Sequence, residues 1–141
     1  MPAQLCGCFA RLRPLRTLYL PQTPIIAIID DDASVRMGIE RLVRSLGYIA
    51  RTFSSADEFL QSSEQGNTSC LITDIHMPGM NGLELQNLLI GQGHKVPIIF
   101  ITAFLEDDIR QRAMNAGAVA LLAKPFAGGA LVQCIETALK R

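Results

Sequence analysis

The sequence has no tryptophan and only two histidines, and aromatic residues make up 6% of it. Hydrophobic residues make up 49%, so any core must be largely aliphatic. No apolar stretch approaches the roughly 20 residues that a transmembrane helix needs. Thirteen basic and thirteen acidic side chains cancel, which gives no general reason to bind nucleic acid or an anionic membrane. We therefore expect a cytoplasmic protein with no direct nucleic-acid or membrane contact.

Several kinds of catalytic and metal-binding chemistry are also missing. There is no Ser-His pair, no histidine base and no glycine-rich phosphate loop. The four cysteines do not form a zinc set, because Cys6 and Cys8 have no second pair or nearby histidine to complete a tetrahedral site. Cys70 and Cys134 lie within apolar patterns and are expected to be small core residues. An enzyme with full turnover is therefore not expected.

The first 23 residues differ in composition from the rest. They carry three arginines, three prolines and no acidic residue. We expect residues 1–23 to be a flexible N-terminal extension and residues 24–141 to form a single domain. An organelle-targeting or membrane-surface role ranks lower, because Pro14 interrupts any long amphipathic helix.

From Ile25 onward, apolar runs alternate with segments of helical periodicity. The first helical segment has an apolar stripe: Val35, Ile39, Leu42, Val43 and Leu46. The pattern repeats to give five strand–helix units, with the fifth strand expected at residues 118–123. The last helix begins at Ala127-Gly128-Gly129, which offers no good cap and is expected to fray. Short connections and no internal repeat predict an α/β fold with a doubly wound, five-stranded parallel sheet.

Four apolar runs each end at a polar residue. IIAII ends at Asp30, Asp31 and Asp32, and CLIT ends at Asp74. IIFI ends at Thr102, and VALLA ends at Lys124. Continuous Val/Ile/Leu runs are typical of buried parallel strands, whose carboxyl ends carry the reactive groups of open α/β sheets. These side chains are therefore expected to converge on one site.

The charges at this site favour a divalent cation and a phosphoryl group. If Asp31 and Asp74 lie 4–5 Å apart, their carboxylates repel by roughly 3–4 kcal/mol at an effective dielectric near 20. A cation between them relieves that repulsion. Oxygen ligands suit Mg²⁺, and the lack of soft ligands argues against zinc. Lys124 and Thr102 can then hold phosphoryl oxygens, while Asp74 is the candidate nucleophile.

Taken singly, these residues have simpler interpretations. Asp74 alone would be an Asx cap, Lys124 a solvated charge and Thr102 a choice of strand propensity. His76 stands where a haloacid-dehalogenase-type phosphatase would carry a second Asp. It either lines the pocket and tunes water attack or points into solvent. The small Ala103 leaves the approach to the site open.

Together, IIDDDASVR, LITDIHMPGMNG, IIFITA and AKPF resemble the receiver domain of a two-component response regulator. The resemblance covers Ile25 to about Leu139 and is nearest to the receivers of LuxR-type and FixJ-like regulators. It implies a flavodoxin-like fold with strand order 2-1-3-4-5. It also implies that the chain catalyses only its own phosphorylation and dephosphorylation.

The resemblance implies a role for each strand end. Asp74 would accept a phosphoryl group from a histidine kinase or phosphotransfer protein. Mg²⁺ would be bound directly by Asp31 and Asp74, through water by Asp30, and by the backbone carbonyl of His76.

On the other side of the phosphoryl group, Thr102 would bond one of its oxygens and Lys124 would pair with it. The bond between Lys124 and Pro125 would be cis. Asp32 is expected to cap the first helix.

One position departs from the family pattern. Receivers often carry an aromatic residue on the fifth strand that reports phosphorylation, and in this register the position is Leu121. A leucine cannot swing a ring between buried and exposed states, which puts the usual switch in doubt. The output surface is still expected on the helix after Thr102, the fifth strand and the last helix. The resemblance also leaves room for a homodimer that forms on phosphorylation.

Several whole-protein interpretations remain open. We expect a stand-alone receiver, because the chain ends at Arg141 without a helix-turn-helix segment. The alternatives are an excised receiver of a DNA-binding transcriptional regulator and a flavodoxin-like small-ligand binding protein, although no Ser/Thr-rich phosphate loop follows the first strand. A Mg²⁺-dependent phosphatase and a degenerate receiver that acts as a scaffold are weaker possibilities.

Overall fold

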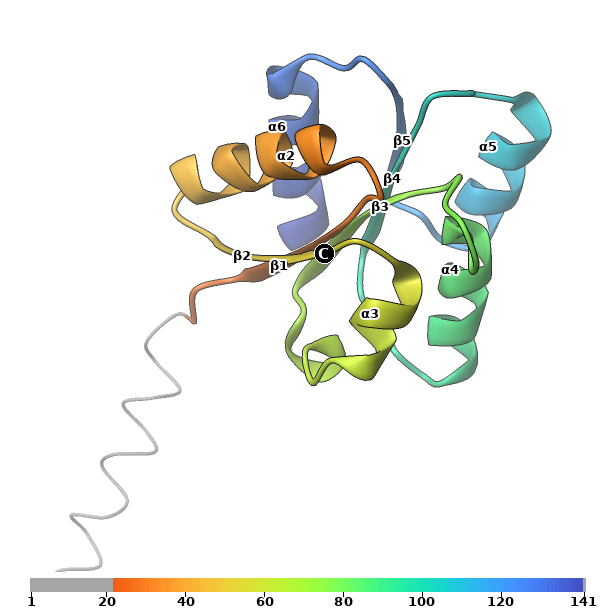
Figure 1. Ribbon diagram of the computed structural model, residues 1–141, viewed down its shortest axis with the longest axis horizontal. Coiled ribbons are helices and arrows are strands. Elements are labelled where there is room, and N and C mark those ends of the chain that lie inside the picture. The colour runs from red at the N-terminus through yellow and green to blue at the C-terminus, as the bar shows by residue number, and fades with distance from the viewer. Residues whose placement is uncertain (1–21, 141) are drawn as a thin grey trace, which may run out of the picture.

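The computed structural model describes residues 22–140, which alternate strand and helix throughout (Figure 1). The strands are β1 (Ile25–Ile29), β2 (Ile49–Phe53), β3 (Cys70–Asp74), β4 (Ile98–Thr102) and β5 (Ala120–Ala123). The helices are α2 (Ala33–Ser45), α3 (Ala56–Gln61), α4 (Gly82–Gly91), α5 (Asp107–Asn115) and α6 (Gly128–Leu139). A short 3₁₀ turn, Gln65–Asn67, lies in the polar stretch before β3.

All five strands are parallel and lie in the order β2-β1-β3-β4-β5. The predicted α/β fold and strand order are therefore confirmed. β3 is buried along its whole length, as expected for the middle of a sheet with both faces covered.

The helices form one layer on each face of the sheet (Figure 1). On one face, α2 and α6 pack over Ile26, Ile28 and Ile72. On the other, α3, α4 and α5 pack over Ala27, Ile29 and Leu71. Consecutive residues of one strand therefore pack into the hydrophobic clusters on opposite faces of the sheet, because side chains alternate along a strand. The sheet edge where the strands end is left for polar groups.

Side-chain bonds cap the starts of α2, α3 and α4, whereas α5 and α6 begin without one. Asn81 and Glu84 form a complete capping box at α4. At α3, the Ser55 hydroxyl accepts from the Glu58 N–H, but Glu58 bonds Ser54 instead of closing the box on Ser55. α6 begins after Ala127 without a side-chain cap, as predicted. Its fraying stays a prediction.

β5 is shorter than the predicted segment 118–123. The N–H of Ala118 donates to the carbonyl of Ala113 at 3.0 Å, so residue 118 closes the end of α5 and is not part of the ladder. Gly117 takes a left-handed φ of +103° between the two elements. The expected thiols Cys6 and Cys8, and nearly all of the extension 1–23, lie outside the described residues. Cys70 is buried as predicted, and Cys134 is half-buried.

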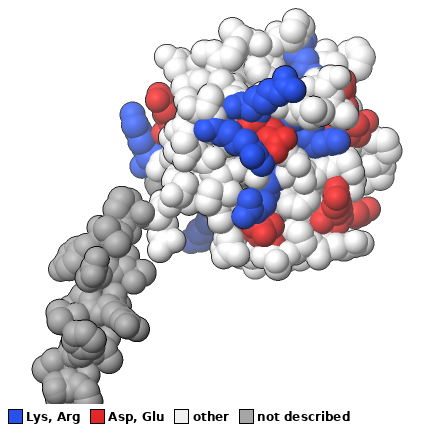
Figure 2. All heavy atoms as spheres, turned by 60° about the vertical axis from the view of Figure 1, so that its left-hand side comes forward, with Lys and Arg blue, Asp and Glu red and all other residues white. Residues whose placement is uncertain are grey.

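The described surface carries charges of both signs. Figure 2 shows basic side chains gathered around acidic ones on one face of the domain. Two ion pairs on the described surface join Arg44 to Glu40 at 3.0 Å and Arg51 to Glu64 at 3.8 Å. Within residues 22–140, no helix has the length and apolar character needed to cross a membrane.

Candidate functional site

The acidic end of β1 is held by bonds to almost every polar group of Asp30. Its Oδ1 accepts from the Asp32 N–H at 2.9 Å, and its own N–H donates to the Phe53 carbonyl at 3.2 Å. Its carbonyl accepts from Arg36 Nη1 at 2.6 Å. Asp30 is fully buried, whereas Asp31 beside it is exposed. The loop therefore points one carboxylate inward and leaves the next facing solvent.

Asp32 caps α2, as predicted. Its Oδ1 accepts from the N–H groups of Ser34 at 2.9 Å and Val35 at 3.4 Å. Because this carboxylate is used by the helix, Asp32 is not part of the carboxylate cluster.

Asp74 ends β3 and is 5% exposed. Its Oδ1 accepts from the His76 N–H at 3.2 Å, and its Oδ2 accepts from Lys124 Nζ at 3.0 Å. Behind it, Gly82 begins α4 so close to the strand that a Cβ on that glycine would lie 2.5 Å from the Asp74 carbonyl oxygen. A glycine is required there by the close approach of two backbones.

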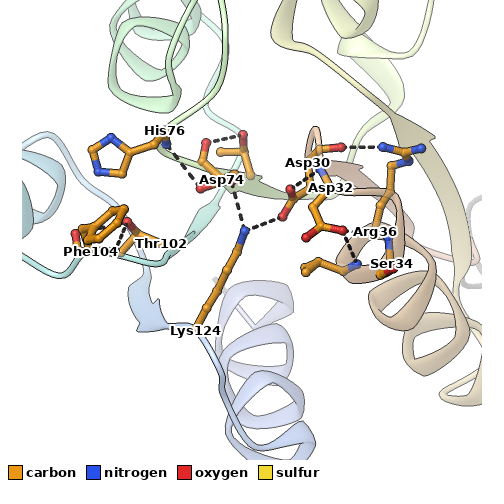
Figure 3. A network of polar contacts seen from close by, with 11 residues as sticks. Asp30, Asp32, Ser34, Arg36, Asp74, His76, Thr102, Phe104 and Lys124 are labelled. Carbon is orange, nitrogen blue, oxygen red and sulfur yellow. Dashed lines mark hydrogen bonds and ion pairs between the residues drawn. The ribbon is translucent and has the colours of Figure 1, made fainter.

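Lys124 joins the two buried carboxylates (Figure 3). Its Nζ lies 3.0 Å from Asp30 Oδ2 and 3.0 Å from Asp74 Oδ2. Burial acts to lower the pKa of Lys124, but the hydrogen bonds and charges of the two carboxylates outweigh it, and the net pKa is raised. Lys124 is therefore a firmly held cation. The bond between Lys124 and Pro125 is cis, as the resemblance implied.

Three carboxylates converge at this edge. One oxygen each from Asp30, Asp31 and Asp74 lies within 4.8 Å of the others. Asp30 Oδ2 is buried and accepts no aligned hydrogen bond, although the Lys124 ammonium lies 3.0 Å away. Burial also raises the pKa of Asp30, with the charge of Asp74 adding to the effect. An incompletely satisfied set of hard oxygen donors fits a divalent cation such as Mg²⁺.

Thr102 ends β4 on the other side of Asp74. Its hydroxyl accepts from the Phe104 N–H at 3.1 Å and lies 3.1 Å from the Phe104 carbonyl, to which it donates. The Phe104 ring meets the His76 imidazole edge-on, with centroids 6.0 Å apart (Figure 3). His76 is exposed, as is Ala103 between Thr102 and Phe104.

The structure brings the predicted site residues to one sheet edge, with Leu121 apart from them. Leu121 pairs with Phe100 on β4 and is buried in the cluster beneath α5. Sequence reasoning missed Arg36, Gly82 and Phe104. The Asn-Gly pair before α4 was a signal for Gly82, but nothing local indicates that Arg36 reaches Asp30 or that Phe104 meets His76.

A family model matches this architecture. The model for the response regulator receiver domain covers residues 26–136. The chain belongs to the response regulator receiver family. Receiver domains are signalling domains of two-component systems, and they bind Mg²⁺ at an acidic pocket. The described aspartates form a cluster of the kind that could hold that ion.

The curated relatives that the chain matches are longer regulators. The chain is 41% identical over 119 residues to the response regulator protein TmoT of Ectopseudomonas mendocina, covering 84% of this chain and 54% of TmoT. It is 34% identical over 116 residues to the transcriptional regulatory protein FixJ of Bradyrhizobium diazoefficiens, covering 82% of this chain and 57% of FixJ. The chain thus spans about half the length of the curated relatives it matches.

Solved structures agree. The response regulator StyR shares 42% identity at a TM-score of 0.78, over 84% of this chain and 60% of StyR. The structure titled FixJ-N shares 30% identity at a TM-score of 0.76, over 86% of this chain and 97% of that one. The FixJ-like character expected from the motifs is confirmed.

Proposed function

We propose that this receiver accepts a phosphoryl group on Asp74 from a histidine kinase or phosphotransfer protein. One observation carries the proposal: the Lys124 ammonium lies 3.0 Å from carboxylate oxygens of both Asp30 and Asp74, at the edge where three carboxylates meet. Such a site combines a nucleophile with a fixed cation and a cluster suited to a metal.

The transfer is a substitution at phosphorus. A carboxylate oxygen of Asp74 forms the new O–P bond as the P–N bond to the donor histidine breaks. The electron pair of that bond stays on the imidazole nitrogen. Lys124 offsets negative charge on the phosphoryl oxygens, and the Thr102 hydroxyl donates to one of them.

Mg²⁺ would be held by Asp31 and Asp74 directly, by Asp30 through water, and by the backbone carbonyl of His76. The ion would neutralise charge on the carboxylates and the phosphoryl group. The buried, incompletely paired oxygen of Asp30 supports its inclusion in the set.

For the whole chain, we propose that residues 24–141 form the receiver and that residues 1–23 are an extension to it. The receiver would work by protein contact, with α5, β5 and α6 as the output surface and a homodimer as one form of that contact. A cytoplasmic location stays a prediction. A second candidate is the receiver part of a transcriptional regulator. The half-length match to relatives with that name favours it.

Incubation with Mg²⁺ and acetyl phosphate, followed by intact mass measurement, tests the proposal. The wild-type chain should gain one phosphoryl group, and Asp74→Asn should gain none. Asp57→Asn, which removes an exposed carboxylate at the start of α3, is the matched control and should be phosphorylated normally. No added mass, or added mass that persists in Asp74→Asn, would refute Asp74 as the acceptor.

A further inference from the structure

The Thr102 hydroxyl has a single proton, and the Phe104 carbonyl lies where it can accept that proton. The hydroxyl donates to the Phe104 carbonyl and accepts from the Phe104 N–H, each at 3.1 Å. A hydroxyl offers one donor and two acceptor positions. It therefore cannot donate to the Phe104 carbonyl and to a phosphoryl oxygen at the same time. Any phosphoryl group that takes this proton must release the Phe104 carbonyl.

Phe104 is linked to Asp74 along a second route. Its ring packs edge-on against the His76 imidazole, with centroids 6.0 Å apart and planes at 74°. The His76 N–H donates to Asp74 Oδ1 at 3.2 Å. Figure 3 shows Phe104 beside both Thr102 and His76, at the outer side of the site. The first route ends at the Phe104 backbone and the second at its ring, so both reach the same residue.

The Phe104 side chain is exposed and therefore accessible to a partner protein. Phe104 is 67% exposed, more than the other large hydrophobic residues of the described chain that reach solvent. Leu105 follows it at 39%. Leu121, by contrast, is 8% exposed and lies in the core. Its backbone is paired in the sheet with Phe100, so it is not free to follow the Thr102 hydroxyl.

We propose that Phe104 reports phosphorylation of Asp74 to the surface of this receiver, in place of the residue at position 121. The proposal rests on the proposed function. When the phosphoryl group takes the Thr102 hydroxyl proton, the bond to the Phe104 carbonyl breaks, the loop that carries Phe104 shifts, and the ring leaves His76. The surface formed by Phe104 and Leu105 then differs between the two states. That difference is what a partner would recognise.

The absence of tryptophan gives a clean reporter. In Phe104→Trp, the single indole replaces the ring that meets His76. Met114→Trp puts an indole at another exposed hydrophobic position, on α5, and serves as the control. Each variant is loaded with beryllium fluoride and Mg²⁺ as a phosphoryl mimic. Loading should shift the emission of Phe104→Trp to longer wavelength as the indole becomes more exposed, and leave Met114→Trp nearly unchanged.

The role of the proton is tested at position 102 in the Phe104→Trp background. Thr102→Val keeps the side-chain shape and removes the hydroxyl. Its unloaded emission should already match that of the loaded Thr102 protein, and loading should add nothing. Thr102→Ser keeps a hydroxyl and should respond to loading. An unchanged emission in Phe104→Trp, or a response of full size in Thr102→Val, would overturn the proposal.

Intact mass after acetyl phosphate treatment of the same variants separates the two claims. If Asp74 is phosphorylated while the indole at 104 does not respond, the readout proposal fails and the proposed function stands. If no phosphoryl group is added, the proposed function itself fails. Methyl NMR of Leu121 in the otherwise unchanged chain measures the rival readout. If loading changes the Leu121 methyl signals while the indole emission at position 104 stays unchanged, the core position is the readout and the proposal fails.

Discussion

The two sides of Asp74 are built differently. On one side, Asp30 is fully buried and joined to Lys124, and Gly82 seats α4 directly against the strand. On the other side, Thr102 bonds the backbone of an exposed loop, and two exposed rings meet at its outer surface. The first side is fixed by packing and charge. The second is held only by hydrogen bonds and a ring contact between exposed loop residues. Its conformation can therefore change when Asp74 is phosphorylated.

The largest effect on stability is expected from Gly82→Ala, which disturbs the packing of α4 against β3 on the fixed side of Asp74. The new Cβ would lie 2.5 Å from the Asp74 carbonyl oxygen and 3.0 Å from the Ile75 Cα, and neither backbone atom can move cheaply. We expect a loss of about 3 kcal/mol in the free energy of unfolding, measured by urea denaturation. Gly38→Ala is the control. Its Cβ meets nothing within 4 Å, so that variant should gain about 0.5–1 kcal/mol. Equal effects at the two glycines would contradict the fixed contact behind Asp74.

Lys124→Met should have the next largest effect. It removes the cation shared by Asp30 and Asp74 and leaves a buried carboxylate uncompensated. We expect a loss of about 1–3 kcal/mol at neutral pH, and Mg²⁺ should restore part of it by supplying charge at the same place. Because the pKa of Lys124 is raised in the fold, its contribution persists below the ordinary value of 10.5 and is lost only as pH rises above it. A loss that Mg²⁺ does not reduce would argue against a cation site there.

A smaller, pH-dependent effect is expected from Asp30→Asn. The folded-state pKa of Asp30 is raised by burial above 3.8, so ionising it costs stability as pH rises through the folded value. At neutral pH without divalent cations, Asp30→Asn should therefore melt above the wild type. Near pH 3 the difference should vanish, because the wild-type carboxyl is protonated in both states. Thermal melts with EDTA and with Mg²⁺ measure this. A variant that melts below the wild type in EDTA would show that Asp30 is already fully stabilised by Lys124.

The smallest effect on stability is expected at the exposed side. Phe104→Ala removes a ring that is 67% exposed, so unfolding should change by no more than about 0.5 kcal/mol. Asp74 should still be phosphorylated, because the ring touches His76 and not the carboxylate. Urea denaturation and intact mass test both points. A loss comparable to that of Gly82→Ala would mean that the loop is anchored and not free to respond.

The parts of the fold that the sequence predicts correctly are those marked by a pattern of neighbouring residues. Apolar runs that end in polar residues identified four strand ends, and helical periodicity placed the helices between them. The start of β5 could not be read in this way. Ala118 is apolar and fits a strand, but its N–H is taken by the end of α5. The capping box that the spacing of Ser55 and Glu58 predicts is not closed, because the Glu58 carboxylate accepts from the N–H and hydroxyl of Ser54 instead.

Within the site, the sequence predicts where the charged side chains lie, because they stand at strand ends. It does not predict the residues that support them. Asp30, Asp74 and Lys124 occupy strand ends, so their meeting follows from strand order. Arg36 acts on Asp30 from the first turns of α2, through a backbone carbonyl that any residue would offer. Phe104 meets His76 only because two loops from neighbouring strands lean together. Such contacts depend on tertiary placement, for which a linear sequence gives no spacing rule.

Asp31 is the exposed member of a carboxylate cluster whose other two members are buried. A divalent cation bound there would keep one side toward water and would enter and leave without any opening of the core. Occupancy would then follow the free cation concentration around the protein. Competence for phosphorylation would therefore be reversible by chelation alone, in a domain that stays folded throughout.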